Sequence, residues 1–393
     1  MGSAVFFLLL FALIGSLIAL RVFVGHLHRH LAEAKQISPV LADRDLLDLP
    51  SVSVVIPAYN EAENIQDCVN SVLNSSNYER LEVWVVDDQS SDQTLAIVRA
   101  IQDPRLKVLA GKPRPVGEGW VGKNWACAQV TPLTTGEFLL FIDADVQLKR
   151  GAIETAVAVA QREQIDLLTF WMTIVCGCWG EWLAQPIIAS LFAAGYSFAE
   201  VCDPDSEAAF AVGPFMLFRR SAYEQIGGHR SVSREVVEDV QLGRRIKQYG
   251  LKLWYGLGPD MADVRMYRST GALWEGWTKN WYIGSNRNPK AISYTAFVTL
   301  LIFTVPWLGL TIALINLFGS FNGWDLGLMM LALIAIVLQY DLRCLIQKFS
   351  NIPPRYWWLS GIGGGLVSAI TIASIIKTET GWGWTWRGRN LSN

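Results

Sequence analysis

The sequence is poor in charge for its length. Only 17% of its 393 residues are Asp, Glu, Lys or Arg, and the formal net charge is -2. A chain without a basic excess offers no broad positive field to a nucleic-acid backbone, so we exclude nucleic acid as a partner. The six cysteines are scattered, the pair Cys176 and Cys178 lacks zinc-ligand spacing, and there are only four histidines. We therefore expect no zinc site, and thiols that stay reduced as in the cytosol.

Long apolar runs, in contrast, are present at both ends of the chain. Residues 4–24 are apolar over a length that can cross a bilayer as one helix. No small-residue cleavage site follows this run, which favours an uncleaved anchor over a signal peptide. The basic and histidine-rich segment from Arg21 to Lys35 places the chain that follows it in the cytoplasm by the positive-inside rule. The sequence thus predicts an integral membrane protein whose central domain faces the cytoplasm.

Three more apolar blocks follow residue 290, and their topology stays open. They cover residues 291–318, 326–340 and 357–376. The middle block is short and is either spanning or interfacial. Basic residues, Arg343 among them, are expected in the loop after it, and the chain after the last block is similarly basic, so the positive-inside rule does not fix the side of the C-terminus. The tryptophans at 382, 384 and 386 predict an aromatic anchor at the membrane interface.

The central part of the chain alternates between strand and helix patterns. Short apolar or β-branched runs predict strands at residues 52–56, 81–86, 106–109 and 138–142. Turns rich in acidic residues or proline end the strands, and helical spacing follows, with a first helix expected from Asn60 or Glu61. This alternation predicts an α/β fold with a parallel sheet and right-handed crossovers. The polar turns should meet at one edge of the sheet.

The run from Phe138 to Val146 is the most informative stretch. Five apolar residues end in two carboxylates, Asp143 and Asp145. Two carboxylates this close repel each other unless a positive group lies between them. A hard divalent cation, with substrate phosphates completing its shell, satisfies both. A solvated acidic turn is the alternative for the motif taken alone.

Two further segments are candidates for the same edge. The glycine- and proline-rich loop 112–125 enters a helix near Lys123, which suits phosphate contact at a helix start, although an ordinary surface loop is also possible. A strand-like run covers 210–218. Asp239 opens a later helix and is either a cap or a general base. The apolar stretch 170–201 is either core or an interfacial helix set.

With these residues in view, the chain resembles the membrane-attached family 2 glycosyltransferases, which have a GT-A fold. The matching stretches are Val54–Glu61, Val85–Asp92, Phe141–Asp145, Gly213-Pro214 with Arg219-Arg220, and Val237–Val240. The likeness covers roughly residues 50 to 285. The segments Gly122–Ala126 and Trp386–Arg389 are similar to a subgroup that acts on hydrophobic acceptors such as hopanoids and carotenoids.

The resemblance implies an α/β GT-A domain, with a Rossmann-like mixed sheet flanked by helices, plus transmembrane or interfacial helices. The expected division of the sequence is an N-terminal anchor and basic linker, a catalytic domain, and C-terminal membrane helices with an aromatic and basic tail. These segments cover residues 1–48, 49–290 and 291–393.

The resemblance also implies a role for each matching residue around the donor. Asp88 would hydrogen-bond the nucleotide base. The pocket for the base and the sugar nucleotide would be lined by Pro57, Tyr59, Glu61, Lys123 and Asp143. The donor is expected to be a UDP-, GDP- or dTDP-sugar.

Two more roles concern the chemistry. Asp145, supported by Asp143, would hold Mg²⁺ or Mn²⁺ against the diphosphate, where the ion stabilises the leaving group. Asp239 would take the proton from the acceptor hydroxyl as that hydroxyl attacks the anomeric carbon. This is a direct inverting displacement.

One departure from the family pattern bears on the acceptor. Many membrane members carry Gln-x-x-Arg-Trp, whereas this chain has Trp277-Thr278-Lys279-Asn280-Trp281. Only Trp281 fits, which argues against a processive polysaccharide synthase. Lys279 or Arg287 could supply the missing positive charge, so these two and Trp281 are candidate diphosphate contacts.

The leading hypothesis is therefore a nonprocessive, metal-dependent transferase that moves one sugar to the hydroxyl of a carotenoid, hopanoid or glycolipid type of lipid. The first alternative is a polyprenyl-phosphate sugar synthase. A processive polysaccharide synthase and a noncatalytic sugar-nucleotide-binding scaffold are the others. Fold alone does not decide among them.

Overall fold

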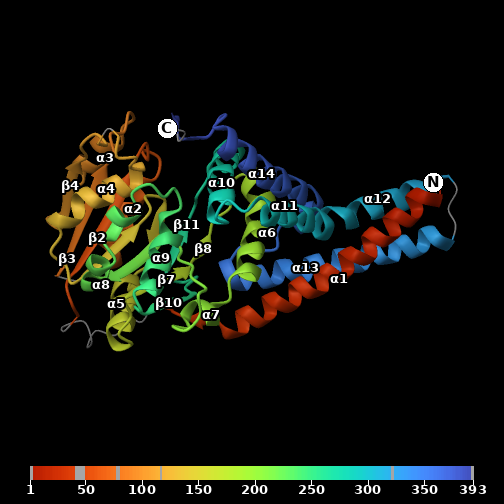
Figure 1. Ribbon diagram of the computed structural model, residues 1–393, viewed down its shortest axis with the longest axis horizontal. Helices are drawn as coiled ribbons and strands as arrows, with labels where there is room; N and C mark the ends of the chain where they lie inside the picture. Colours follow the sequence, from red (N-terminus) through yellow and green to blue (C-terminus); the bar gives the residue numbers. More distant parts are fainter. Residues whose placement is uncertain (1–2, 40–48, 77–79, 116, 320–322, 391–393) are drawn as a thin grey trace. The chain divides into compact units, whose positions relative to one another are not determined.

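The structure is a computed structural model that describes residues 3–39, 49–76, 80–115, 117–319 and 323–390. The chain forms two compact units, each built from separated stretches (Figure 1). Residues 33–175 and 196–266 form the sheet unit, and residues 1–32, 176–195 and 267–393 form the helical unit. The expected division at residues 48 and 290 stays a prediction about sequence segments.

The sheet unit is built on an eight-stranded sheet. Its strands, in spatial order, are β1 (Lys35–Gln36), β10 (Leu253–Leu257), β7 (Leu167–Trp171), β9 (Phe215–Arg219), β5 (Phe138–Ile142), β2 (Val52–Ala58), β3 (Leu81–Asp87) and β4 (Leu106–Ala110). All neighbours are parallel except β9, which runs antiparallel to both β5 and β7. The sheet is therefore mixed. β5 and β7 are buried along their whole length, as expected for strands covered on both faces.

Helices and a small second sheet surround this core. The helices are α2 (Ile65–Ser75), α3 (Thr94–Ala100), α4 (Gly122–Val130), α5 (Ala152–Arg162), α7 (Phe198–Cys202), α8 (Arg220–Gln225) and α9 (Glu238–Gln248), with short 3₁₀ turns η1 (Thr131–Leu133) and η2 (Gly228–Val232). The second sheet consists of β6 (Val146–Leu148), β11 (Ala262–Val264) and β8 (Thr173–Ile174). α2 buries Ile65, Val69 and Val72, the stripe that its spacing predicts.

Two element boundaries differ from the sequence-based prediction. The helix expected from Asn60 or Glu61 begins only at Ile65, because the chain first turns: Asn60 has a φ of +52° and the Glu61 carbonyl accepts from the amides of Asn64 and Ile65. The strand expected over 210–218 is only Phe215–Arg219.

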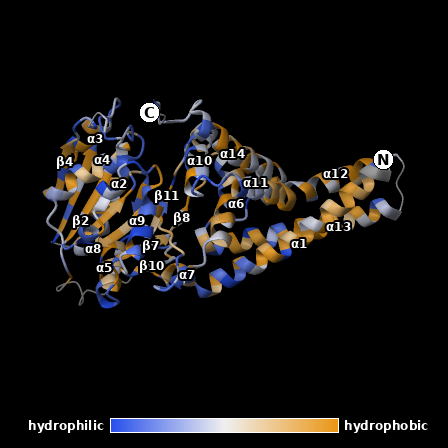
Figure 2. Cartoon of the chain, viewed as in Figure 1, coloured by the Kyte–Doolittle hydropathy of each residue, from blue (hydrophilic) through white to orange (hydrophobic). Residues whose placement is uncertain are grey.

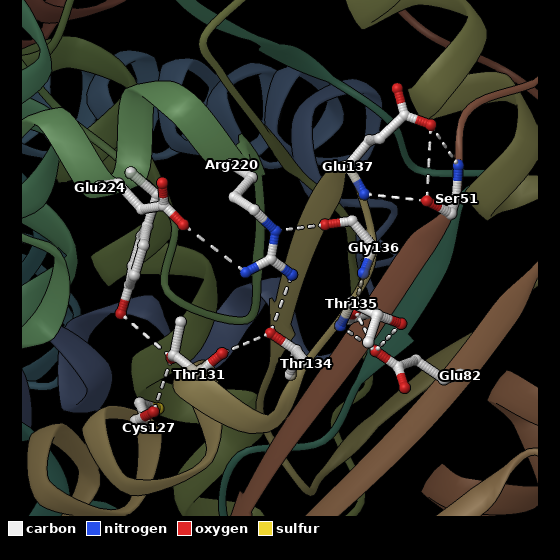
Figure 3. Close-up of polar contacts among 12 residues, drawn as sticks. Ser51, Glu82, Cys127, Thr131, Thr134, Thr135, Gly136, Glu137, Arg220 and Glu224 are labelled. Carbon is white, nitrogen blue, oxygen red and sulfur yellow. Dashed lines mark hydrogen bonds and ion pairs between the residues drawn. The ribbon is translucent and has the colours of Figure 1, made fainter.

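A polar network holds the end of the sheet where β2 and β5 begin (Figure 3). Arg220 Nε donates to the Gly136 carbonyl at 2.5 Å and Nη2 to the Thr134 hydroxyl at 2.9 Å. The Glu137 amide donates to the Ser51 hydroxyl at 3.0 Å. Because these contacts lie at the start of the strands, Arg220 has a structural role, although its motif was among those that carried the family resemblance.

The helical unit contains long apolar helices. They are α1 (Ser3–Glu33), α6 (Trp179–Gly195), α10 (Thr270–Gly284), α11 (Pro289–Thr299), the π-turn η3 (Leu300–Thr304), α12 (Val305–Leu317), α13 (Gly323–Ser350), the 3₁₀ turn η4 (Trp357–Leu359) and α14 (Ser360–Thr380). A hairpin of β12 (Thr385–Trp386) and β13 (Arg389–Asn390) follows. Four helical stretches are long and apolar enough to cross a membrane: Phe6–Glu33, Pro289–Leu317, Gly323–Ser350 and Trp357–Thr380. Hydrophobic colour dominates α1, α12 and α13 (Figure 2).

Three expectations about the apolar segments are revised. Arg343 does not lie in a loop, because α13 continues to Ser350 and the Arg343 side chain is 3% exposed. The stretch 170–201 divides between the two units, with the strands β7 and β8 in the sheet unit and α6 in the helical unit. In the tail, Trp384 is buried and only Trp382 is strongly exposed, at 79%.

Candidate active site

The parallel strands β2 and β3 bring two polar turns together where they end. The Asp88 amide donates to the Ala58 carbonyl at 2.8 Å. The Asn60 amide donates to the Ser90 hydroxyl at 3.0 Å, and the Ser91 amide returns a bond to Asn60 Oδ1 at 2.8 Å. Asp88 is 4% exposed. The two turns thus form one hydrogen-bonded unit that holds a buried carboxylate at the sheet edge.

The remaining candidates for the base pocket lie on the same turns. Pro57 is the penultimate residue of β2, while Tyr59 and Glu61 follow the strand and are half-buried. The Glu61 amide donates to Thr94 Oγ1 at 2.8 Å, which ties the first turn to the start of α3. Pro57, Tyr59 and Glu61 thus lie in or after the end of β2, next to the turn that carries Asp88. Their contact with a nucleotide stays a prediction.

Lys123 lies at the centre of the second cluster. Its Nζ is 2.6 Å from Asp143 Oδ1 and 2.6 Å from Glu238 Oε1. Lys123 is in the first turn of α4, Asp143 follows β5, and Glu238 opens α9. Burial alone would lower the pKa of Lys123, but the carboxylates around it outweigh that effect and raise the pKa well above its ordinary value. Lys123 is therefore a permanent cation that links three elements.

The neighbouring residue, Asn124, fixes the same region through its side-chain amide. Asn124 is fully buried, and its Nδ2 donates to the Val232 carbonyl at 2.7 Å and the Glu235 carbonyl at 2.9 Å. These carbonyls belong to the segment that leads into α9. The first turn of α4 thus holds α9 both by charge, through Lys123, and by hydrogen bonds, through Asn124.

Asp239 lies beside this cluster with a constrained carboxylate. Its Oδ2 accepts from the Gly213 amide at 3.0 Å and its Oδ1 from the Val240 amide at 2.8 Å. Burial, together with the neighbouring Glu238 carboxylate, raises the pKa of Asp239 to about 7, against the opposing effect of Lys123. A carboxylate with this pKa can accept a proton near neutral pH.

A close backbone approach keeps the Asp239 carboxylate where it is. A Cβ on Gly213 would stand 2.7 Å from Asp239 Oδ2, closer than such atoms approach. Glycine at 213 is therefore needed for its lack of a side chain, which explains why Gly213-Pro214 accompanies the Val237–Val240 motif in the sequence.

Asp143 and Asp145 follow β5 directly, as the sequence predicts. Among the described residues no group of three or more His, Cys, Asp or Glu side chains could hold a metal ion. Two carboxylates one residue apart nevertheless suit Mg²⁺ or Mn²⁺, which usually bind one or two protein carboxylates and take the remaining oxygens from phosphates and water. The pair thus fits a metal that binds together with a diphosphate.

An aromatic side chain that the sequence did not single out lies within electrostatic reach of Asp239. Burial raises the pKa of the Tyr196 hydroxyl, and Arg244 and Asp239 act on it in opposite directions. The Tyr196 ring lies 4.2 Å from that of Phe210, centroid to centroid. Phe210 is buried and supports the half-buried Tyr196 ring, which is the aromatic side chain near Asp239 that could contact an apolar acceptor.

The sequence analysis also did not single out Glu238. Its signal was present, because two consecutive carboxylates at a helix start need a compensating charge. The cation proved to be Lys123, which sequence reasoning had assigned to the donor alone.

The other three candidates, Lys279, Trp281 and Arg287, belong to the helical unit. Lys279 Nζ lies 4.3 Å from the ring centroid of Trp386. Trp281 packs against Phe192 with centroids 5.6 Å apart, and Arg287 follows α10 with a φ of +53°. Their contact with a diphosphate stays a prediction.

Comparison with known proteins agrees with this geometry. Residues 53–227 match the family model described as Glycosyl transferase family 2. A mannosyltransferase from Pyrobaculum calidifontis, solved in complex with GDP-Man and Mn²⁺, superposes with a TM-score of 0.54 at 18% identity, covering 96% of this chain and 98% of that one. The chain has a GT-A fold with four apolar helices that could span a membrane.

Curated relatives carry a more specific name. The 4,4'-diaponeurosporenoate glycosyltransferase of Staphylococcus haemolyticus is 28% identical over 239 residues, which are 60% of this chain and 62% of that protein. The Staphylococcus aureus USA300 enzyme of the same name is 26% identical over 62% of this chain and 64% of its own length. The match therefore spans less than two thirds of these relatives. The resemblance to carotenoid-type family 2 glycosyltransferases is confirmed.

Proposed function

We propose that this protein transfers a single sugar from a nucleotide-sugar donor to a hydrophobic lipid, with inversion at the anomeric carbon and without processive elongation. The observation that carries the proposal is the cluster at the sheet edge, in which Lys123 joins Asp143 to Glu238 beside Asp239. In this cluster, Asp143 is the candidate contact for the metal and the diphosphate, and Asp239 is the candidate base.

Asp239 is the proposed base for a lipid hydroxyl. As the acceptor oxygen attacks the anomeric carbon, its proton passes to the Asp239 carboxylate. The bond from that carbon to the phosphate oxygen breaks, and the nucleoside diphosphate leaves. A single displacement of this kind inverts the anomeric centre. The Gly213 and Val240 amides hold the carboxylate in one orientation, which is the positioning that base catalysis needs.

Asp88 is the proposed contact for the nucleotide base, and Asp143 with Asp145 the proposed site of a divalent cation. That cation would be Mg²⁺ or Mn²⁺ and would supply charge stabilisation to the leaving diphosphate. The mannosyltransferase structure with GDP-Man and Mn²⁺ supports this assignment by analogy of fold. Lys123 keeps Asp143 in place before the donor arrives.

The acceptor is proposed to be a polyene or polycyclic lipid. The apolar helices of this chain and the names of its relatives support a hydrophobic acceptor. The ending "-oate" in those names denotes a carboxylate, which has no proton to remove at neutral pH. A carboxylate acceptor is therefore the second candidate, and the raised pKa of Asp239 is what favours a hydroxyl.

The test is nucleoside diphosphate release by purified full-length protein with Mn²⁺, a panel of UDP-, GDP- and dTDP-sugars, and lipid extract. Release that requires lipid and falls by about 10²–10⁴-fold in Asp239→Asn supports base catalysis on a hydroxyl. Release that survives Asp239→Asn indicates a carboxylate or polyprenyl-phosphate acceptor. No release from any donor by folded protein would overturn the proposal and favour the scaffold alternative.

A further inference from the structure

One charged side chain of the helical unit is buried without a matching anion. Arg343 in α13 is 3% exposed, and neither Nη1 nor Nη2 donates a hydrogen bond to any described residue. Its Nε lies 3.4 Å from the Ser360 hydroxyl, which is a long contact for a hydrogen bond. A guanidinium carries five N–H donors, so most of them are unused.

Nothing described around Arg343 compensates its charge. No described carboxylate forms an ion pair with it, and the Cys176 thiol is the titratable group resolved in its surroundings. The adjacent Gln339, one turn earlier on the same helix, differs sharply. Its Nε2 donates to the Ile302 and Phe303 carbonyls, and its Oε1 accepts from Trp307. The contacts with the π-turn and Trp307 thus satisfy the buried side chain of Gln339. No comparable contact satisfies the buried guanidinium of Arg343.

The start of α14 does not supply the missing partner of Arg343. The turn η4 runs directly into α14, and both the amide and the hydroxyl of Ser360 donate to the Trp357 carbonyl. The Ser360 oxygen is therefore the one described contact of the guanidinium, through Nε. Because Nη1 and Nη2 are buried donors without an acceptor among the described residues, the position attracts an oxyanion.

The depth of the site identifies the kind of molecule that carries the oxyanion. Arg343 follows directly on the apolar run 326–340, so it lies where the hydrocarbon region of a bilayer gives way to headgroups. Tyr340 and Trp357 pack against each other with centroids 5.3 Å apart, and such aromatic side chains are typical of that depth. A soluble anion is disfavoured here, whereas a lipid headgroup reaches this level.

We propose that the guanidinium of Arg343, beside Ser360, is the binding site for the oxyanion headgroup of a membrane lipid, either a phosphate or a carboxylate. The planar guanidinium would bind two oxygens of the headgroup at once, through Nη1 and Nη2. The site does not depend on transferase chemistry.

The experiment uses the full-length protein in detergent and measures its thermal unfolding with two matched lipid pairs. Oleate is compared with methyl oleate, and dioleoyl phosphatidate with dioleoylglycerol, because each pair differs only in the oxyanion. We expect the acidic member of at least one pair to raise Tm and its neutral partner not to do so. The pair that responds separates a carboxylate from a phosphate ligand.

Arg343→Met removes the charge and keeps an apolar volume. We expect it to bind the acidic lipid at least about tenfold more weakly, as for lost charge-assisted hydrogen bonds. Lys348→Met is the matched control, since Lys348 is exposed on the same helix, and it should keep the wild-type response. If Arg343→Met does not fold, Arg343→Lys should show a smaller rise in Tm with the acidic lipid. Lysine keeps the positive charge but lacks the planar pair of N–H donors that binds two oxygens at once. Equal lipid responses of wild type and a folded Arg343 variant, or no response of the wild type to either acidic lipid, would overturn the site.

Discussion

Asp239 is the residue whose environment most directly predicts a pH dependence. Its pKa is raised to about 7 by burial and by Glu238, and a base must be deprotonated to act. We therefore expect kcat/KM to rise with pH between about 6 and 8 and then to level off. The measurement is a pH profile of nucleoside diphosphate release with a hydroxyl acceptor; a flat profile over this interval would contradict the assignment.

The same shift predicts the opposite trend for stability. A carboxyl whose pKa is raised on folding favours the folded state at low pH, below its ordinary value of about 4, and this contribution disappears as pH rises through about 7. Asp239→Asn removes the unfavourable free energy of keeping a buried negative charge at this position. The variant should therefore unfold at a higher temperature than wild type at pH 8, with a smaller difference at pH 5, by differential scanning fluorimetry.

We expect the substitution Lys123→Met to lower both the stability of the protein and its affinity for the donor. Lys123→Met leaves Asp143 and Glu238 without the cation that lies 2.6 Å from each. Because Lys123 is 27% exposed, we expect a modest destabilisation of about 1–2 kcal/mol and a donor KM about tenfold higher or more. Lys107→Met is the control, since Lys107 lies on the edge strand β4 and pairs with Glu82 of β3. Equal donor KM values for the two variants would show that Lys123 is only structural.

At the scale of elements, the contact between α9 and the loop before β9 leaves no room for an added methyl group at Gly213. Gly213→Ala places a Cβ 2.7 Å from Asp239 Oδ2, so the carboxylate must move. We expect kcat to fall by at least about 10²-fold, the scale of a misplaced catalytic group. Gly195→Ala is the control, because nothing lies within 4 Å of its added Cβ. A Gly213→Ala enzyme with normal kcat would show that the position of Asp239 is not critical.

The elements that the sequence predicted well are those with a local cause. β2, β3 and β5 follow from apolar runs that end in polar turns, and parallel pairing brings Asp88 and Asp143 to one edge. The bridge from Lys123 to Glu238 could not be predicted, because it joins residues more than 100 positions apart and spacing says nothing about such pairs. Arg343 was predicted wrongly for another reason. We expected the apolar helix to end before the charged residues, whereas α13 continues to Ser350 and buries the Arg343 side chain.

For the whole molecule, the proposed metal makes a prediction that needs no mutation. If Asp143 and Asp145 bind a divalent cation together with the diphosphate, chelation with EDTA should abolish nucleoside diphosphate release, and added Mn²⁺ or Mg²⁺ should restore it. Equilibrium binding of the nucleoside diphosphate should weaken in the same way. Full activity after thorough chelation would remove the metal from the proposed mechanism.

The helical unit also bears on the side of the membrane that the C-terminus occupies. Four crossings would place the tail opposite the chain that precedes α11. However, Thr385 Oγ1 donates to Glu275 Oε1 in α10 at 2.6 Å, and the Ser374 hydroxyl of α14 donates to the Thr278 carbonyl of the same helix at 2.7 Å. α10 follows residue 266 with no candidate span between them. From these contacts we predict that the tail lies on the same side of the membrane as α10, and that α14, although long and apolar enough to span, does not cross completely.

This topology is testable with an impermeant maleimide and sealed vesicles of both orientations. Glu63→Cys, at an exposed site of the sheet unit, and Trp382→Cys, at a side chain that follows α14 and is 79% exposed, should react from the same side, which we propose is the cytoplasm. Phe318→Cys should react from the other side, because Phe318 is 95% exposed at the end of α12 and one complete span separates it from α10. The wild-type chain measures the background from its native thiols. Reaction of Trp382→Cys together with Phe318→Cys would instead require α14 to cross and the contact of Thr385 with Glu275 to be absent in the membrane.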